Sequence, residues 1–350
     1  MLDIKDFDFH LPQNLIAQKP AKPRDHSRLL VLHKNSNKLE HKHFYEIIDY
    51  LQRGDILILN NSKVIPARLI GTKEKTAGKV EIFLHHHLKN NLWQCLIGGK
   101  RVYEGLKINF SKKLNCKIIK NNNDGTWDVE FNCYGNVFIK VLKKIGQTPL
   151  PPYIKRSGQT KEDKIDYQTI YADKQKSGSV AAPTAGLHFT KKILSKLKKK
   201  GIQIEYITLH VGLGTFAPVK TTNIKDHKMH AEWTEVNKKV IKNILEAKKN
   251  GKRVIAVGTT STRTLEAIWT KIENRKSKIK NHQDWVDIFI YPGYKFKIVD
   301  GMITNFHLPK STLIMLVSAL TSTSKIKKAY NEAIRNKYRF YSYGDAMLII

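Results

Sequence analysis

The chain has little cysteine and no long apolar run. Its 350 residues include three cysteines, Cys95, Cys116 and Cys133, and none of them form a CxxC pair. An odd number at these spacings argues against a disulfide framework and against a structural zinc site. No apolar run reaches the ~18 residues of a membrane-spanning helix, so we expect no membrane partner. The first residues also lack the basic-then-apolar pattern of a signal peptide, and we therefore expect a cytoplasmic protein.

Acidic residues are also scarce. The chain has 62 Lys and Arg against 30 Asp and Glu, which gives a formal net charge of +32. Such an excess favours a polyanionic partner, because Lys and Arg displace counterions from phosphate backbones. A second explanation is an AT-rich coding sequence that enriches Lys, Asn and Ile at every neutral surface position. Under that explanation a run such as Lys196–Lys200 is only a solvated helix face, and the charge alone names no particular nucleic acid.

Several ligand motifs are absent. The chain has no HExxH motif, so we do not predict a catalytic metal. The GxG of residues 212–214 is too short for a dinucleotide fingerprint and no helix pattern follows it, which excludes a nicotinamide site.

The apolar pattern predicts an α/β main domain, built from both ends of the chain, with an inserted all-β, barrel-like domain. We assign residues 1–70 and 148–350 to the main domain and residues 71–147 to the insertion. In the insertion, alternating apolar residues and intervening turn clusters predict strands at 79–84, 92–97, 106–110, 116–120, 126–131 and 136–141. In the main domain we expect strands at 29–32, 55–59, 204–209, 254–257 and 288–291. Helices are expected at 43–51, 191–199, 236–249, 262–272, 312–319 and 326–336, with a polar surface loop at 273–283.

Residues 179–190 read SVAAPTAGLHFT and concentrate small residues around one imidazole, His188. Backbone with small side chains such as Gly186 can approach a ligand closely, and the hydroxyls of Ser179 and Thr184 can point at it. The alternative is a plain loop before the helix that starts near Thr190.

The segment 210–219, HVGLGTFAPV, follows an expected strand. His210 would then stand at the carboxyl end of that strand, where open α/β sheets bind their ligands. Gly212, Gly214 and Thr215 continue the turn. A hydrogen-bonded core histidine is the alternative for His210.

Residues 253–266 read RVIAVGTTSTRTLE, a strand that runs into hydroxyl side chains and then a helix. Free N–H groups at a helix N-terminus, together with Thr259, Thr260 and Ser261, suit an anion or a carboxylate. Ordinary capping by one hydroxyl is the alternative. Arg263 and Glu266 lie three residues apart, a spacing that often means only a surface salt bridge.

Two further blocks combine aromatic, basic and polar residues. The first, 290–311, contains Tyr294, Asn305 and His307 among several lysines, and the second, 338–348, contains Tyr343 and Asp345. Interleaved aromatic and basic residues can stack bases and pair phosphates. Core packing is the competing explanation for the aromatic residues.

These blocks, in this order, resemble the S-adenosylmethionine:tRNA ribosyltransferase-isomerase family of queuosine biosynthesis. The resemblance covers nearly the whole chain and includes GDILILNNSKVIPARLIG, GSVAAPTAGLHFT, ITLHVGLGTFAPV, VGTTSTRTLE, ITNFHLPKSTLIMLVSA and YRFYSYGDAMLI. Three departures stand out: Ala77 replaces an expected glycine, Gly301 replaces a usual alanine, and 320–324 differ from the usual continuation. None of them changes a hydroxyl or imidazole with an expected role in the chemistry.

The resemblance implies a reaction with tRNA. The ribosyl part of S-adenosylmethionine is transferred and isomerised onto 7-aminomethyl-7-deazaguanine at the wobble position of GUN anticodons, in the Tyr, His, Asn and Asp isoacceptors. Epoxyqueuosine-tRNA, adenine and methionine are formed, so S-adenosylmethionine is a consumed cosubstrate rather than a cofactor. The resemblance also suggests a monomer.

This chemistry needs a base at the C5′ proton beside the sulfonium and an acid for the departing adenine, and histidine suits both. The expected catalytic residues are His188, His210, His307 and Asp345, and which histidine is base or acid stays open. The expected substrate-binding residues are Ser179, Thr184, Gly186, Gly212, Gly214, Thr215, Thr259, Thr260, Ser261, Arg263, Glu266, Tyr294, Asn305 and Tyr343. Among them, Tyr294 or Tyr343 could face the sulfonium, and the 253–266 turn could receive the methionine carboxylate.

Two other functions remain as alternatives. One is a non-catalytic tRNA-binding protein that retains the fold, but the hydroxyl and imidazole blocks exceed what backbone binding needs. The other is an S-adenosylmethionine-dependent RNA methyltransferase, which would carry a glycine-rich loop after its first strand. The first expected strand instead ends in His33, Lys34 and Asn35.

Overall fold

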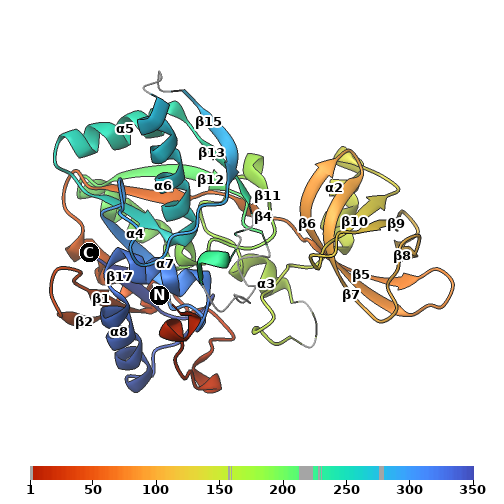
Figure 1. Cartoon of the computed structure of the whole chain (residues 1–350), viewed down its shortest axis with the longest axis horizontal. Coiled ribbons are helices and arrows are strands. Elements are labelled where there is room, and N and C mark those ends of the chain that lie inside the picture. The colour runs from red at the N-terminus through yellow and green to blue at the C-terminus, as the bar shows by residue number, and fades with distance from the viewer. Residues whose placement is uncertain are drawn as a thin grey trace.

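The protein has two parts, a large mixed sheet covered by helices and a closed β-barrel. The computed structural model describes residues 3–156, 158, 160–212, 224–227, 229, 231–275 and 280–350. Figure 1 shows the large sheet with its helices at one end of the long axis and the barrel at the other. The predicted fold class is thereby confirmed: a main domain drawn from both ends of the chain, with a barrel inserted into it.

The large sheet has nine strands. Their order across the sheet is β15 (His282–Val286), β13 (Glu232–Val236), β12 (Gln203–Leu209), β3 (Ile56–Asn60), β14 (Val254–Val257), β16 (Gly301–Asn305), β17 (Ala346–Ile349), β1 (Arg28–Leu32) and β2 (Leu39–His43). The four adjacent strands β12, β3, β14 and β16 are parallel. Their carboxyl ends therefore lie along one edge of the sheet, the position where open α/β sheets bind ligands.

Strand β3 is buried on both faces, as its unbroken apolar run predicts. Leu57 and Leu59 pack toward α1 (Ile47–Tyr50) and α4 (Lys191–Lys199). Ile56 and Ile58 point the other way, toward α5 (Lys238–Lys249) and α6 (Gly258–Arg275). Successive side chains alternate because a strand has a period of two residues.

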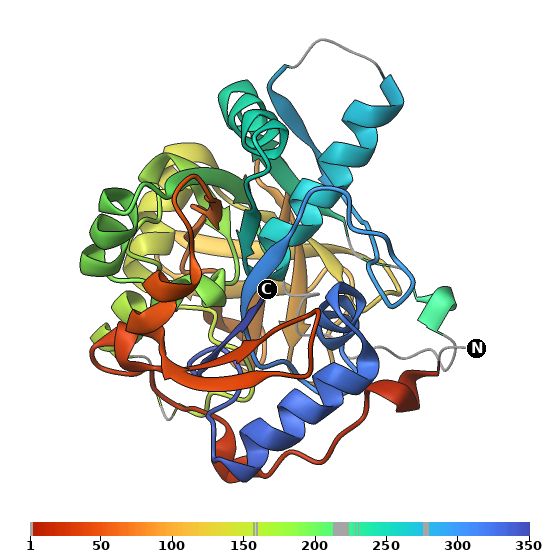
Figure 2. The ribbon, with the colours of Figure 1, turned by 90° about the vertical axis from the view of Figure 1, so that its left-hand side faces the viewer.

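Helices α7 (Thr312–Leu320) and α8 (Thr323–Arg335) cover the end of the sheet that holds β16, β17 and β1. Figure 2 views the molecule from this side, with α8 in dark blue at the front, close to the orange-red β1 and β2. No helix in the described ranges is both long and apolar enough to cross a membrane.

The barrel has six antiparallel strands and one packed helix. The strands are β5 (Arg68–Lys73), β6 (Lys79–Lys89), β7 (Leu92–Gly98), β8 (Lys107–Ser111), β9 (Leu114–Asn121) and β10 (Trp127–Phe131). Helix α2 (Gly135–Ile145) packs Phe138 and Leu142 against the barrel core. The strand predicted at 136–141 is therefore wrong, because the buried residues recur every four positions, the spacing of a helix.

Shorter elements complete the chain. Strands β4 (Lys63–Val64) and β11 (Ser177–Ser179) pair with each other, and α3 is a short helix, Lys161–Asp166. The 3₁₀ turns are η1 (Ile4–Phe7), η2 (Gln13–Leu15), η3 (Arg24–His26), η4 (Phe44–Glu46), η5 (Lys174–Lys176), η6 (Thr184–His188) and η8 (Ile224–Asp226). The strand predicted at 288–291 is also wrong, since β15 ends at Val286 and the apolar residues after it are in coil.

Candidate active site

Polar and glycine residues follow the parallel strands at their shared carboxyl edge. Asn60 ends β3, His210 follows β12, Gly258 follows β14 and Asn305 ends β16. Four segments that are far apart in the sequence therefore meet at one edge. Two of the cavities that the described residues form open there.

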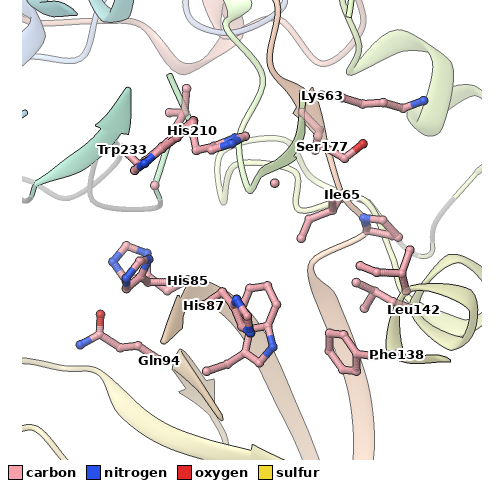
Figure 3. Close-up of a pocket in the computed structure, with 18 of the residues that line it drawn as sticks. Lys63, Ile65, His85, His87, Gln94, Phe138, Leu142, Ser177, His210 and Trp233 are labelled. Atoms are coloured by element: carbon pink, nitrogen blue, oxygen red, sulfur yellow. The ribbon is translucent and has the colours of Figure 1, made fainter. Parts of the chain in front are cut away.

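The larger cavity has a volume of about 1300 Å³ and lies between this edge and the barrel. His210 and Trp233 stand on the sheet side, and His85, His87 and Phe138 stand opposite on the barrel (Figure 3). The wall also contains Lys63, Ile65, His86, Trp93, Gln94, Leu142, Lys143, Lys164, Lys174, Ser177, Gly178, Val211, Gly212, Glu232 and Trp285. A cavity of this size, with apolar rings and a few polar groups, is typical of a binding site.

The ring of His210 stacks on Trp233, with centroids 5.2 Å apart and planes 19° from parallel. Burial lowers the pKa of His210 from 6.5 to about 4, so the imidazole is neutral at pH 7. Its buried Nδ1 has no hydrogen-bond partner within the part of the chain that the structure describes. A Cβ on Gly178 would lie 2.9 Å from His210 Cε1, so glycine at this position leaves room for the ring.

An ion pair supports the same wall. Arg263 Nη1 lies 2.6 Å from Glu232 Oε2, and both side chains are buried. Glu232 Oε1 also accepts the backbone N–H of Gly212 at 3.0 Å. Arg263 thus pairs across to β13 rather than with Glu266, its neighbour on the helix. The predicted Gly214 and Thr215 lie outside the described residues.

The smaller cavity has a volume of about 60 Å³ and lies at the ends of β14 and β16. Five of the residues predicted from sequence line it: Thr184, Thr259, Thr260, Asn305 and His307. Val211 lines both cavities, which are therefore neighbours. The structure brings together the 179–190, 253–266 and 290–311 blocks in this way.

His307 is buried in the wall of the smaller cavity. Its Nε2 lies 2.8 Å from Thr304 Oγ1, and its backbone N–H donates to the hydroxyl of Tyr330. Burial lowers the pKa of His307 from 6.5 to about 3. The ring is therefore neutral at pH 7.

His188 lies behind the smaller cavity and reaches it through Asn305. Its Nδ1 is 2.7 Å from Ser27 Oγ, and its Nε2 is 3.2 Å from Asn305 Nδ2. Burial, and then the nearby charges of Arg339 and Arg24, lower the pKa of His188 to about 3. The reasoning from sequence favoured imidazoles that titrate near neutral pH, whereas burial holds all three well below it.

The other predicted residues in the described ranges do not line either cavity, and several of them are held by internal contacts. Glu266 accepts hydrogen bonds from the Tyr294 hydroxyl and from the N–H groups of Lys297, Ile298 and Val299. Its carboxylate therefore holds the 294–299 segment onto α6.

Internal contacts also account for three other predicted residues. Asp345 and Ser179 make hydrogen bonds, and Gly186 packs against Tyr171. Asp345 accepts the backbone N–H groups of Arg28 and Arg339. The Ser179 hydroxyl donates to Ala181 O and accepts from Val211 N. A Cβ on Gly186 would lie 2.0 Å from the Tyr171 hydroxyl oxygen. The hydroxyls of Ser261 and Tyr343 are buried and have no partner among the described residues.

The sequence reasoning missed the barrel side of the large cavity. The run His85, His86 and His87 lies near the end of β6, and Trp93 on β7 completes this wall. Trp285, on β15 of the large sheet, also lines the cavity and was missed as well. Three consecutive histidines beside an expected strand were the available signal. Within the described ranges, no group of three or more His, Cys, Asp or Glu side chains could hold a metal ion.

The fold combines a nine-stranded α/β sheet with an inserted barrel, and a ligand-sized cavity lies between them, an arrangement typical of a ligand-binding domain. A sequence model of the family described as "Queuosine biosynthesis protein" matches residues 4–349, and the chain belongs to this family. The chain is also similar to the crystal structure of S-adenosylmethionine tRNA ribosyltransferase from Thermotoga maritima. The two share 37% identity over 99% of this chain and 100% of that chain, with a TM-score of 0.56. The resemblance predicted from sequence is confirmed, and with it an enzyme of the transferase class.

Proposed function

We propose that the chain transfers and isomerises the ribosyl part of S-adenosylmethionine onto 7-aminomethyl-7-deazaguanine at the tRNA wobble position. The products are epoxyqueuosine-tRNA, adenine and methionine. The observation that carries the proposal is a cavity of about 1300 Å³ lined with rings, at the carboxyl edge of the sheet, in a chain whose family match spans 4–349.

The lining of the large cavity suits both reactants, S-adenosylmethionine with its purine and sulfonium, and the deazaguanine base of the tRNA with its amine. Trp233, Trp285 and Trp93 offer faces on which a purine or a deazaguanine can stack. The same faces attract a sulfonium cation. Lys63 and Lys174 at the wall can pair with phosphates of the anticodon loop, in a chain of net charge +32.

His210 is the residue we assign to proton transfer. It lies in the large cavity, is neutral at pH 7 and has an unpartnered Nδ1. A neutral imidazole can accept the C5′ proton beside the sulfonium, and the imidazolium formed can give a proton to the departing adenine. One residue then serves as base and afterwards as acid.

The finer details follow from the resemblance. The tRNA substrates are those with GUN anticodons, for Tyr, His, Asn and Asp, and no cofactor takes part. The protein acts as a cytoplasmic monomer.

Incubation with labelled cosubstrate tests this function. Label in the ribosyl carbons should enter tRNA that carries 7-aminomethyl-7-deazaguanine, whereas label in the methyl group should not. The matched control is the same tRNA with guanine at the wobble position, which should take up neither label. Transfer of the methyl label would indicate a methyltransferase, and transfer of neither label to the modified tRNA would indicate a binding protein.

A further inference from the structure

Two polar side-chain atoms of residues that line the smaller cavity are buried and have no hydrogen-bond partner among the residues that the structure describes. They are Thr260 Oγ1 and Asn305 Oδ1, on side chains of residues that are 7% and 3% exposed. Both residues line the cavity. Because an unsatisfied buried polar atom is costly, such atoms mark a place where a ligand completes the hydrogen bonding.

Thr260 stands in the first turn of α6, an 18-residue helix that begins at Gly258 directly after β14. The first N–H groups of a helix have no carbonyl partner within it, and the helix dipole makes this end positive. The hydroxyls of Thr262 and Thr264 bond the carbonyls of Gly258 and Thr260, so they do not cap these N–H groups. This end of the cavity therefore suits a carboxylate.

Asn305 contributes a hydrogen-bond acceptor, in contrast to the N–H donors at the start of α6. Its Nδ2 donates to Tyr341 O at 3.1 Å and to His188 Nε2 at 3.2 Å, which leaves Oδ1 as an acceptor. The carbonyl of Tyr341 can only accept, so the amide orientation is fixed. Ser27 and the ring of Phe44, stacked at 5.1 Å, hold His188 in place. This end of the cavity therefore suits an ammonium group.

We propose that the smaller cavity binds the α-amino acid head group of S-adenosylmethionine. The carboxylate lies at the N-terminus of α6 with the Thr260 hydroxyl, and the ammonium group donates to Asn305 Oδ1. His188 is a positioning residue that fixes the Asn305 amide. This inference rests on the proposed function and adds to it the place of the methionine end.

The sizes of the two cavities agree with this division. A volume of about 60 Å³ is that of ~2 water molecules in the liquid, which suits a small head group but not a nucleoside. The adenosine part then occupies the larger cavity. Because Val211 lines both, the carbon chain between the sulfur and the head group passes this residue.

Cosubstrate analogues test the proposal on the unaltered protein. Decarboxylated S-adenosylmethionine lacks the carboxylate, and S-adenosyl-4-methylthio-2-hydroxybutyrate lacks the ammonium group. With each, kcat/KM in the tRNA reaction should fall ~100-fold below the value for S-adenosylmethionine, as expected for the loss of charge-assisted hydrogen bonds. Equal kcat/KM for all three would overturn the proposal.

Paired variants then locate the contact. Thr260→Val should raise the KM for S-adenosylmethionine ~10-fold and leave the KM for the decarboxylated analogue unchanged. The matched control is Thr262→Val, whose lost hydroxyl bonds only the helix backbone. An equal rise in KM for both cosubstrates in Thr260→Val would place the carboxylate elsewhere.

The positioning role of His188 has its own readout. His188→Phe should raise the KM for S-adenosylmethionine but not for the hydroxy analogue, and it should add nothing to Asn305→Leu in the double variant. Additive effects in the double variant would show that His188 does not act through Asn305.

Calorimetry separates this inference from the proposed function. L-methionine should bind the protein alone, whereas 3-(methylthio)propylamine, which lacks the carboxylate, should not, and Thr260→Val should weaken the binding of L-methionine ~10-fold. This result would support the head-group site even if no label were transferred to tRNA. Ribosyl transfer without any preference for the carboxylate would overturn the inference and leave the function standing.

Discussion

The ring of His86 on the barrel meets the ring of Trp285 on β15 edge-on, with their centroids 4.6 Å apart. Both residues line the larger cavity, so this contact joins the inserted barrel to the large sheet at the cavity wall. Burial, and then the neighbouring His87, lower the pKa of His86 and favour the neutral ring. Trp285 remains 43% exposed and can still offer a face to a nucleic-acid base.

Replacing Trp285 should weaken the use of tRNA. Stacking of one base on an aromatic ring is worth about 1–3 kcal/mol, so Trp285→Ala should raise the KM for tRNA by about 5- to 150-fold. The KM for S-adenosylmethionine should change little. The matched control is Tyr134→Ala, which removes a barrel ring that is 63% exposed and not part of the cavity wall. Equal effects of the two variants would contradict a specific role of Trp285.

Acid should destabilise the protein through its buried histidines. The pKa of His188 is about 3 in the folded protein against an ordinary 6.5, so below pH 6.5 the unfolded chain binds more protons. The contribution of neutral His188 to the free energy of unfolding is fully present above pH 6.5 and is lost progressively as the pH falls toward 3. Between pH 7 and pH 5 the loss is about 2 kcal/mol for this one group.

His188→Gln should therefore reduce the difference in unfolding free energy between pH 7 and pH 5 by about 2 kcal/mol, measured by denaturant titration at both pH values. The exposed His10→Gln controls for the loss of an imidazole as such. An unchanged pH dependence in His188→Gln would show that folding does not lower the pKa of His188.

Glu266→Gln should destabilise the main domain. The carboxylate accepts from the Tyr294 hydroxyl and from three consecutive backbone N–H groups, and the side chain is fully buried. A glutamine keeps one acceptor oxygen and turns an NH₂ group toward N–H donors. We expect a loss of about 2–4 kcal/mol in unfolding free energy, measured by denaturant titration. A loss too small for the titration to detect would show that the Glu266 carboxylate does not hold the 294–299 segment onto α6.

Ala77→Gly should stabilise the barrel. Ala77 has φ of +51° in an exposed turn, a conformation that glycine adopts without strain. The gain should be about 0.5–1 kcal/mol after the larger entropy of the unfolded glycine chain is subtracted. A rise in the thermal midpoint checks this, and a fall would show that the turn does not strain Ala77. The glycine expected here from the resemblance has the same physical reason.

Elements with strong local signals were predictable. Helix α4 has the predicted bounds, Lys191–Lys199, because the Thr190 side chain caps it and Ile193, Leu194 and Leu197 form one apolar face. The insertion was predictable as a barrel from its alternation, although α2 was missed where β-branched residues hid a helical spacing. Helix α6 begins four residues before the predicted 262, because its Thr and Ser residues lie inside the first turn rather than before it.

Thr259, Asn305 and His307 stand at or after strand ends, and they meet at the smaller cavity because such ends converge in any parallel sheet. The barrel side of the larger cavity was not predicted from the sequence. Its position against the sheet depends on contacts between distant segments, such as His86 with Trp285, that leave no local pattern in the sequence. The internal roles of Glu266 and Asp345 were hidden for the same reason.

The most direct test is a structure of the protein with S-adenosylmethionine bound. The account predicts adenosine in the larger cavity with C5′ nearest His210, and the methionine head group between Thr260 and Asn305. Cosubstrate bound at another face, or with its nucleoside remote from His210, would contradict it.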